Sequence, residues 1–330
     1  ATTLRSTRHS RHSLWFVGFL GGAGFLVGVS SGCGSGFGSG LVLGTVYRVT
    51  PSSMPTKHPL TYKMDNVSQT LFYPLLGRAL ASRQWPDLFP DPWARQAEEI
   101  ARKEGTTAKA MEGFPTIIYG LRHRISVLEI TRYLDEHPGA AVVNIGCGLD
   151  SLAQDLGGYD CTIYNLDFPD VIDMRARWIP RAENEKELPY SATDLEWLDH
   201  VDASRGVIAV AAGVFFYLDI DDVRALVTAM AERFPGGRLT YDAESPSMTE
   251  RSERMVAKNG TPTPMPFKLK DPYTPRTWSD NIADVRVTFN FLDYFPRSLR
   301  RQLPLFTFRF GMFMIKLMRG MYQVTIDFKG

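Results

Sequence analysis

The sequence predicts an α/β fold, in which a doubly wound, mostly parallel sheet follows a helical cap and carries an insertion over the carboxyl ends of its strands. Three observations predict this class. Short apolar runs alternate with amphipathic helical patterns from residue 140 onward. The segment before residue 140 has the apolar spacing of helices. A glycine turn follows the first predicted strand, and an acidic residue follows the second.

The middle of the chain has the outline of a nucleotide-binding βαβ unit. Apolar residues 140–145 predict a buried strand, and residues 161–166 predict a second strand after a short helix. Gly146 and Gly148 form the turn after the first strand and leave its backbone open to a ligand. Asp167 ends the second strand, where its carboxylate can accept hydrogen bonds from both hydroxyls of a ribose.

Two classes of ligand fit this outline, dinucleotides and S-adenosylmethionine. A dinucleotide site needs a third small residue after the turn, and Ser151 is small enough to leave that class open. Asp150 beside the turn would repel a pyrophosphate but would suit a ligand with a cationic sulfonium and an ammonium group. The turn therefore favours the methyl donor, with a dinucleotide or no ligand as the alternatives.

The composition is that of an ordinary globular protein without a nucleic-acid partner. Of the 330 residues, 44% are hydrophobic and 22% are charged, and the formal net charge is +1. The cysteines Cys33, Cys147 and Cys161 provide neither a disulfide framework nor a metal-ligand cluster, so we expect no metal and a reducing, cytoplasmic location. Cys147 lies in the turn without a histidine near it in the sequence, which favours a small apolar side chain over a nucleophile.

Residues 1–53 differ in composition from the rest of the chain. A basic start with Arg5 and Arg8 precedes the apolar stretch 14–29, which is short for a membrane span and contains several glycines. We interpret residues 1–53 as a disordered or non-native leader. The alternative is a targeting segment or a membrane anchor formed by residues 1–30.

Residues 54–139 are predicted to form the helical cap. Apolar residues repeat at helical spacing, and Asp91 followed by Pro92 is typical of a helix start. Arg122 and Arg124 lie near the middle of the last predicted helix, either on a solvated face or against a ligand carboxylate. The predicted helices cover residues 69–81, a segment that starts at residue 91, and residues 116–134.

Residues 140–330 are predicted to form the core, with an insertion at about residues 245–280 that is rich in proline and polar groups. Helices and strands alternate after the second strand, and the chain ends with two strands of alternating apolar and polar residues. Residues 182–187 are polar, so we expect them to be solvated. The predicted helices are 169–178 and 220–234, and the predicted strands are 207–213, 238–242, 285–293 and 322–328.

Two joined motifs resemble the leucine carboxyl methyltransferase family. The first runs Asn144-Ile-Gly-Cys-Gly-Leu-Asp150, and the second runs Tyr164-Asn-Leu-Asp-Phe-Pro-Asp-Val171. The resemblance continues through Thr193-Asp-Leu195 and the segment 212–218, and it covers roughly residues 65–328. It is strongest to the bacterial branch that includes a tetracenomycin polyketide O-methyltransferase.

The resemblance implies a class I methyltransferase with a Rossmann-like sheet and S-adenosylmethionine as the methyl donor. In such proteins the glycine turn, here Gly146 and Gly148, packs against the methionine portion of the donor. The acid at the strand end, here Asp167 with Phe168 beside it, is expected at the ribose.

The resemblance also implies contacts at the two ends of the donor. Asp194 and Leu195 are expected at the adenine. An arginine on the helix before the first strand is expected to bind the donor carboxylate, and counting along that helix favours Arg122 over Arg124. Ala212 is expected to lie at the donor, and it stands where protein phosphatase-directed members carry a glutamate, which argues weakly against a protein terminus as the substrate.

The acceptor implied by the resemblance is a small, polyketide-like molecule that is methylated on a carboxylate or a phenolic hydroxyl. A carboxylate is already ionised, whereas a phenol benefits from a base. No catalytic residue is predicted, because His123, His137 and His200 have the pattern of surface or turn residues. Two alternatives stay open: a non-catalytic module of the same fold that binds the donor, which Ala212 favours, and a nicotinamide-dependent oxidoreductase.

Overall fold

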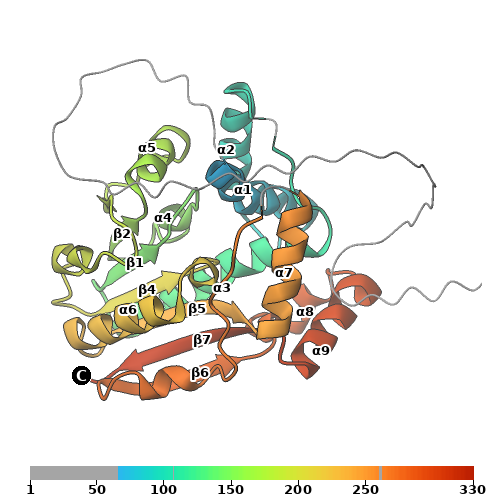
Figure 1. Cartoon of the computed structure of the whole chain (residues 1–330). Helices are drawn as coiled ribbons and strands as arrows, with labels where there is room; N and C mark the ends of the chain where they lie inside the picture. The colour runs from blue at the N-terminus through green and yellow to red at the C-terminus, as the bar shows by residue number, and fades with distance from the viewer. Residues whose placement is uncertain (1–65, 107, 260–261) are drawn as a thin grey trace, which may run out of the picture.

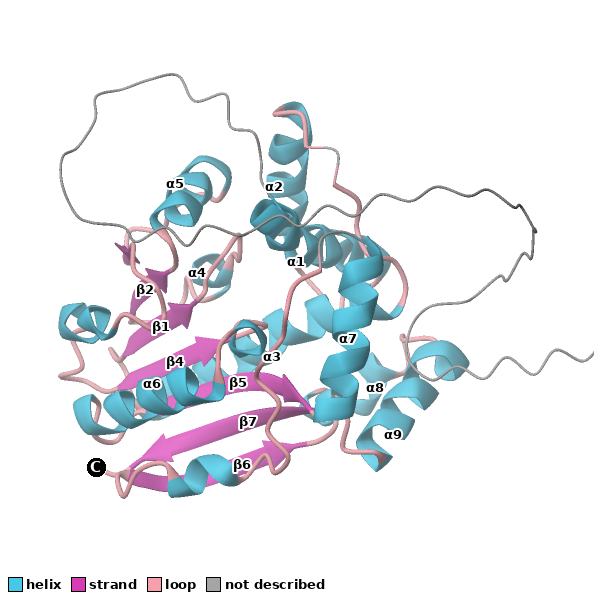
Figure 2. Cartoon of the chain, in the orientation of Figure 1, coloured by secondary structure: helices cyan, strands magenta, loops and turns pink. Residues whose placement is uncertain are grey.

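A seven-stranded sheet forms the centre of the protein (Figures 1 and 2). The computed structural model describes residues 66–106, 108–259 and 262–330, so the predicted leader lies outside the described residues. The strands are β1 Ala141–Ile145, β2 Thr162–Leu166, β3 Glu185–Leu188, β4 Val207–Ala211, β5 Arg238–Glu244, β6 Ile282–Thr288 and β7 Met321–Phe328.

The strand order is β3-β2-β1-β4-β5-β7-β6. The first five strands pair in parallel, and β7 lies antiparallel between β5 and β6. The chain builds outward from β1 through β2 to β3, and it then returns to add β4 on the other side of β1. The carboxyl ends of β1 and β4 therefore form the topological switch point, where open α/β sheets bind their ligands. This topology confirms the predicted α/β class with a mostly parallel, doubly wound sheet.

Helices cover both faces of the sheet. One face packs on α6 (Ile220–Arg233), with Val143 and Ile145 of β1 in that layer. The other face packs on α3 (Phe114–Glu136) and α4 (Leu152–Asp155), and Val142 belongs to that second layer. Because both sides of β1 are covered, its whole sequence is apolar except for Asn144, as expected for a central parallel strand.

The N-terminal helices include the predicted ranges, although α1 (Asn66–Gln84) and α3 begin two or three residues before the predicted positions 69 and 116. Helix α1 packs against α3, and α2 (Pro92–Lys103) packs on α1. Asp91 caps α2, because its Oδ1 accepts a hydrogen bond from the Ala94 N–H at 2.8 Å. Pro92 occupies the first helical position, where a missing N–H costs nothing.

The prediction that residues 182–187 are solvated was wrong for Glu185, whereas Glu183 and Lys186 are exposed, and the segment forms the start of the edge strand β3. Glu185 is only 3% exposed. Its carboxylate accepts hydrogen bonds from Asn165 Nδ2 at 2.5 Å and from the Ala182 N–H at 2.9 Å, and it lies 3.4 Å from a guanidinium nitrogen of Arg175 on α5 (Pro169–Trp178). A buried charge needs such partners, and they come from two other elements of the fold.

The C-terminal third contains more helix than the sequence predicts. The predicted insertion includes α7 (Pro246–Asn259), and two further helices, α8 (Arg297–Arg300) and α9 (Phe310–Leu317), lie between the last two strands. A π-helical turn, η5 (Leu305–Arg309), leads directly into α9. The strand predicted for residues 285–293 ends at Thr288, since Asn290 caps a short 3₁₀ turn that follows.

No helix among the described residues has both the length and the apolar content needed to cross a membrane.

Candidate functional site

A cavity of about 90 Å³ lies at the switch point of the sheet. Its walls come from α1, α3, the glycine turn after β1, the segment after β4, and α7. The polar and backbone part of the lining consists of Arg78, Arg122, His123, Asp150, Ala212 and Gly213, and the apolar and aromatic part consists of Tyr73, Pro74, Tyr119, Tyr217 and Val256.

The glycine turn has a backbone conformation that favours glycine. Gly146 has φ 61° and Gly148 has φ 47°, both in the left-handed region. A Cβ on Gly146 would lie 2.5 Å from a methyl group of Val214, and a Cβ on Gly148 would lie 3.2 Å from a methyl group of Leu71. The turn is therefore packed between the segment after β4 and helix α1.

Asp167 connects the end of β2 to this turn. Its Oδ2 accepts a hydrogen bond from the Gly148 N–H at 2.8 Å, and its Oδ1 accepts one from the Phe168 N–H at 2.8 Å. Burial raises the pKa of the Asp167 carboxyl above its ordinary value, and the two N–H groups oppose that effect. Asp167 is not the cap of α5, because the N-cap position of that helix is Phe168.

A cluster of charged side chains joins the glycine turn to the N-terminal helices. In this cluster, Arg78 of α1 lies 2.8 Å from Asp150 Oδ1 and 3.3 Å from Asp91 Oδ2. His123 of α3 lies with Nδ1 2.8 Å from Asp150 and Nε2 2.7 Å from Asp155. Three carboxylates thus face two cations. We call this set of five residues the Asp150 cluster.

His123 was wrongly predicted as a surface or turn residue, because its side chain is only 2% exposed. Burial by itself lowers the pKa of a histidine, but the carboxylates of Asp150 and Asp155 outweigh burial and raise the pKa of His123 to about 10. The same contacts, with Arg78, hold the pKa of Asp150 well below its usual range in spite of burial. His123 is therefore a buried imidazolium at neutral pH.

Arg122 points into the cavity from α3. Its Nε donates a hydrogen bond to Asp242 Oδ2 at 2.6 Å, and its guanidinium lies over the ring of Phe216 at 5.2 Å. The second oxygen of Asp242 accepts a hydrogen bond from the Gly213 N–H at 2.6 Å. Arg124 is absent from the cavity lining, because residues two positions apart lie on nearly opposite sides of a helix.

Asp242 is a site residue that the sequence did not reveal. It is only 2% exposed at the carboxyl end of β5, where it connects Arg122 to the turn after β4. The sequence does contain a signal for it, because Asp242 is an acidic residue inside a predicted strand. A carboxylate in such a buried position needs a partner, so its presence there indicates a polar contact.

The predicted donor contacts fall into three groups. Arg122 and Ala212 line the cavity. Gly146, Gly148 and Asp167 lie in the turn and at the strand end beside it. The remaining three are exposed: Phe168 is 57% exposed, Leu195 is 38% exposed, and Asp194 caps the short 3₁₀ turn Leu195–His200 by accepting a hydrogen bond from the Glu196 N–H.

Cys147 fits the interpretation of a small apolar side chain. It is 2% exposed, and burial raises the pKa of its thiol well above the usual value. A protonated, buried thiol is a poor nucleophile.

Comparison with known proteins gives one family match and one curated relative. The model of the family described as leucine carboxyl methyltransferase matches residues 66–231. The chain is 30% identical over 189 residues to the tetracenomycin polyketide synthesis O-methyltransferase TcmP of Streptomyces glaucescens. The aligned region covers 56% of this chain and 69% of that protein.

Among solved structures, a Thermobifida fusca YX protein described as a methyltransferase has a TM-score of 0.50 at 15% identity. The similarity covers 82% of this chain and 100% of that chain. At this identity the similarity bears on the fold alone.

The buried imidazolium of His123 predicts a particular pH dependence of stability. The pKa is near 6.5 in the unfolded chain and about 10 in the folded protein, so the contribution is complete below about pH 6.5 and is lost as the pH rises through 10. His123→Gln should therefore lower the unfolding free energy at pH 7, and this deficit should shrink as the pH approaches 10. The measurement is urea unfolding of both proteins from pH 6.5 to 10.

His200→Gln provides the control, since His200 is exposed and bonded only to Tyr190 among the described residues. Its stability curve should run parallel to that of the unchanged protein. A deficit of His123→Gln that stays constant from pH 6.5 to 10 would mean that His123 is not charged in the folded protein.

Proposed function

The chain belongs to the leucine carboxyl methyltransferase family, and on this premise we propose that it methylates an oxygen atom of a small molecule. It is an S-adenosylmethionine-dependent methyltransferase. The acceptor that we propose is a carboxylate or a phenolic hydroxyl of a polyketide-like compound. The observation that carries this acceptor class is the 30% identity to a polyketide O-methyltransferase.

For the methionine portion of the donor we propose a seat between the glycine turn and Arg122. Gly146 and Gly148 have no side chain, so the turn presents its backbone there, with Val214 and Leu71 packed against it. Arg122 is held by Asp242 and lies at the cavity, and a guanidinium can bind a carboxylate with two parallel hydrogen bonds. Ala212 lines the same cavity at the end of β4 and leaves space where a larger side chain would intrude.

The Asp150 cluster supports a cationic ligand rather than a pyrophosphate. Asp150 is the member of the cluster whose carboxylate is most exposed, at 22%, and it lines the cavity. Because the cluster contains three carboxylates and two cations, it has an excess of negative charge. Of its three carboxylates only that of Asp150 lines the cavity, beside the cations Arg78 and His123, and we propose that it attracts the ammonium group of S-adenosylmethionine.

For the adenosine portion we propose the open edge beyond the cavity. Asp167 is the ribose ligand in this proposal, and both of its oxygens already accept N–H hydrogen bonds, so its lone pairs are oriented. Phe168 and Leu195 are among the few large apolar side chains exposed in the described chain, and they follow β2 and β3 in the sequence. We propose that the adenine lies against them, next to Asp194.

Methyl transfer from a sulfonium requires the acceptor oxygen, the methyl carbon and the sulfur in line, with water excluded. The aromatic side chains of Tyr73, Tyr119 and Tyr217 line the cavity and provide apolar walls for an aromatic acceptor. A phenolic acceptor also has a proton to lose. Burial raises the pKa of Glu244, near the carboxyl end of β5, to about 7, although Ser252 donates a hydrogen bond to it at 2.7 Å. Glu244 does not line the cavity, however, so we assign no residue as the base.

The ribose proposal predicts a loss of donor affinity in Asp167→Ala. Each hydrogen bond to a charged group contributes about 1.5–3 kcal/mol, so the dissociation constant for S-adenosylmethionine should rise at least about tenfold. Asp167→Asn keeps one acceptor oxygen and should lose less. Calorimetry of the folded variants measures both effects.

Asp173→Ala is the matched control, because Asp173 is an exposed aspartate on α5. Its donor affinity should equal that of the unchanged protein. An unchanged affinity in Asp167→Ala, together with a lower melting temperature, would make Asp167 a purely structural ligand of the glycine turn.

The acceptor class is tested with methyl-labelled S-adenosylmethionine and two panels of small aromatic compounds, one with carboxylates and one with phenols. We expect labelled products in at least one panel. A methyl ester is released by mild base and a methyl ether is not, so the product identifies the oxygen. Labelling of peptide carboxyl termini alone, with neither panel active, would contradict the proposal.

A further inference from the structure

One surface of the protein concentrates the exposed apolar side chains. Nine large hydrophobic residues are exposed in the described chain, and six of them lie within residues 305–318. Phe306 is 83% exposed and Leu317 is 69% exposed. The six residues are Leu305, Phe306, Phe310, Phe313, Leu317 and Met318, and we call them the α9 apolar face.

Helix α9 and the π-helical turn before it are apolar on two sides. Phe308, Met312 and Ile315 point inward and pack in the core cluster that includes α3 and α1 residues. Phe310, Phe313 and Leu317 follow the i, i+3, i+7 spacing of a second stripe that faces outward. A helix that is apolar on both sides normally packs against other apolar groups on both sides, so the outer stripe indicates a binding surface.

Positive charge predominates in the chain segment that contains the α9 apolar face. Residues 295–326 contain six lysine and arginine residues and no aspartate or glutamate, although the whole chain has a net charge of only +1. Two of the six cations, Arg300 and Lys316, share Asp293 at 3.3 and 3.4 Å. Within the described residues the guanidinium of Arg309 forms no hydrogen bond or ion pair, so it remains available to an external anion.

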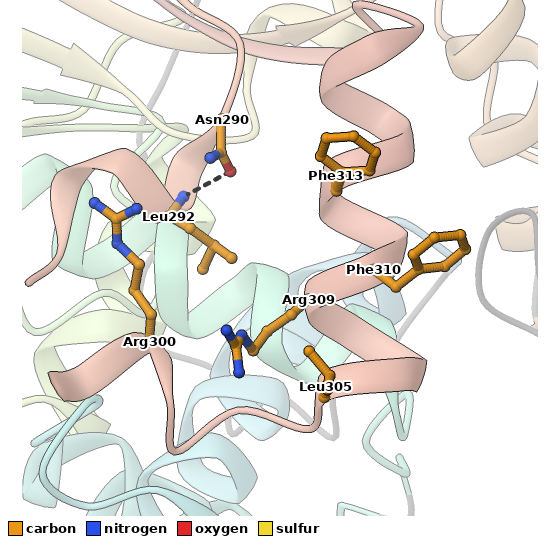
Figure 3. A pocket seen from close by; sticks show the side chains of 7 residues that line it. All are labelled: Asn290, Leu292, Arg300, Leu305, Arg309, Phe310 and Phe313. Carbon is orange, nitrogen blue, oxygen red and sulfur yellow. Dashed lines mark hydrogen bonds between the residues drawn. The ribbon is translucent and has the colours of Figure 1, made fainter. Parts of the chain in front are cut away.

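A groove of about 310 Å³ adjoins this face. Arg300 and Arg309 approach it from opposite sides, and Phe310 and Phe313 project from the neighbouring helix (Figure 3). Leu292 and Leu305 complete the apolar part of its lining. Arg300 is paired with Asp293, so the groove offers one unpartnered guanidinium, that of Arg309, beside apolar side chains. This combination matches an amphiphile that has an anionic phosphate head.

We propose that the α9 apolar face docks on the surface of an anionic phospholipid bilayer. The phenylalanine and leucine side chains enter the boundary between headgroups and acyl chains, as in other interfacial amphipathic helices. Arg309, whose guanidinium has no partner among the described residues, binds a lipid phosphate in the groove. The protein lies on the membrane in this proposal and does not span it.

Charge makes two other occupants unfavourable. A second copy of the chain would bring its own six cations against those of the first, because a two-fold contact places the same patch on both sides. Residues 1–64 of this chain contain arginines and lysines and no aspartate or glutamate, so they too have the same sign of charge. An anionic bilayer complements both the apolar and the basic character of the surface.

Vesicle co-sedimentation of the full chain tests the proposal. The probes are vesicles of phosphatidylcholine alone and vesicles in which roughly one third of the lipid is phosphatidylglycerol. We expect binding to the anionic vesicles only, weakened by added sodium chloride because the phosphate contacts are screened. Inorganic phosphate at matched ionic strength should not displace the protein, since it lacks acyl chains.

Two variants connect the binding to this surface. Arg309→Gln should weaken binding roughly fivefold, the effect expected for one cation near an anionic surface. The double variant Phe310→Ser, Phe313→Ser should weaken binding by at least about tenfold. Arg224→Gln on α6 is the matched control. Arg224 is half exposed, pairs with Asp221 at 3.2 Å, and lies far from α9 in the sequence. It should bind like the unchanged protein, and circular dichroism checks that all variants are folded.

Three results would overturn the proposal. The first is no binding of the folded chain to either vesicle. The second is anionic vesicle binding that the phenylalanine double variant leaves unchanged, which would assign the membrane contact to another part of the chain. The third is a stable dimer that the double variant dissociates, without vesicle binding, which would make the face an interface between two copies.

Discussion

The buried ion pairs of the Asp150 cluster hold the candidate site together. Asp150 is part of the glycine turn, whereas Arg78 and His123 come from α1 and α3. Removing one partner of a buried ion pair typically costs about 3–5 kcal/mol, because an uncompensated charge remains. These ion pairs therefore connect the turn to the N-terminal helices. Arg122, the neighbour of His123 on α3, is positioned by the same constraint.

A second polar contact, made by Asp242, connects the elements that form the opposite wall of the cavity. Asp242 binds both Arg122 and the Gly213 N–H, so α3, β5 and the end of β4 meet at one carboxylate. These buried charges cluster at the carboxyl ends of the central strands, where the topology also expects a ligand. In a family of S-adenosylmethionine-dependent methyltransferases, we interpret this concentration of polar groups as a preformed donor site.

The sequence predicted the parts of this protein that local patterns determine. The glycine turn, the strand that ends at Asp167 and the Asp91 cap each have a short signature, and the structure contains all three. The missed features depend on partners distant in the chain. Glu185 and His123 are buried because Arg175, Asp150 and Asp155 neutralise them, and Asp242 pairs with a residue 120 positions away. Helix α9 was missed because its two apolar faces obscure amphipathic periodicity.

The central claim is that the turn at the end of β1 and the acid at the end of β2 hold the methyl donor. A crystal structure of the protein with S-adenosylhomocysteine, the demethylated product of the donor, tests it directly. The account predicts the ribose hydroxyls within hydrogen-bonding distance of Asp167, the amino-acid carboxylate at Arg122, and the adenine against Phe168 and Leu195. A ligand bound elsewhere, with Asp167 bonded only to the N–H groups of Gly148 and Phe168, would contradict it.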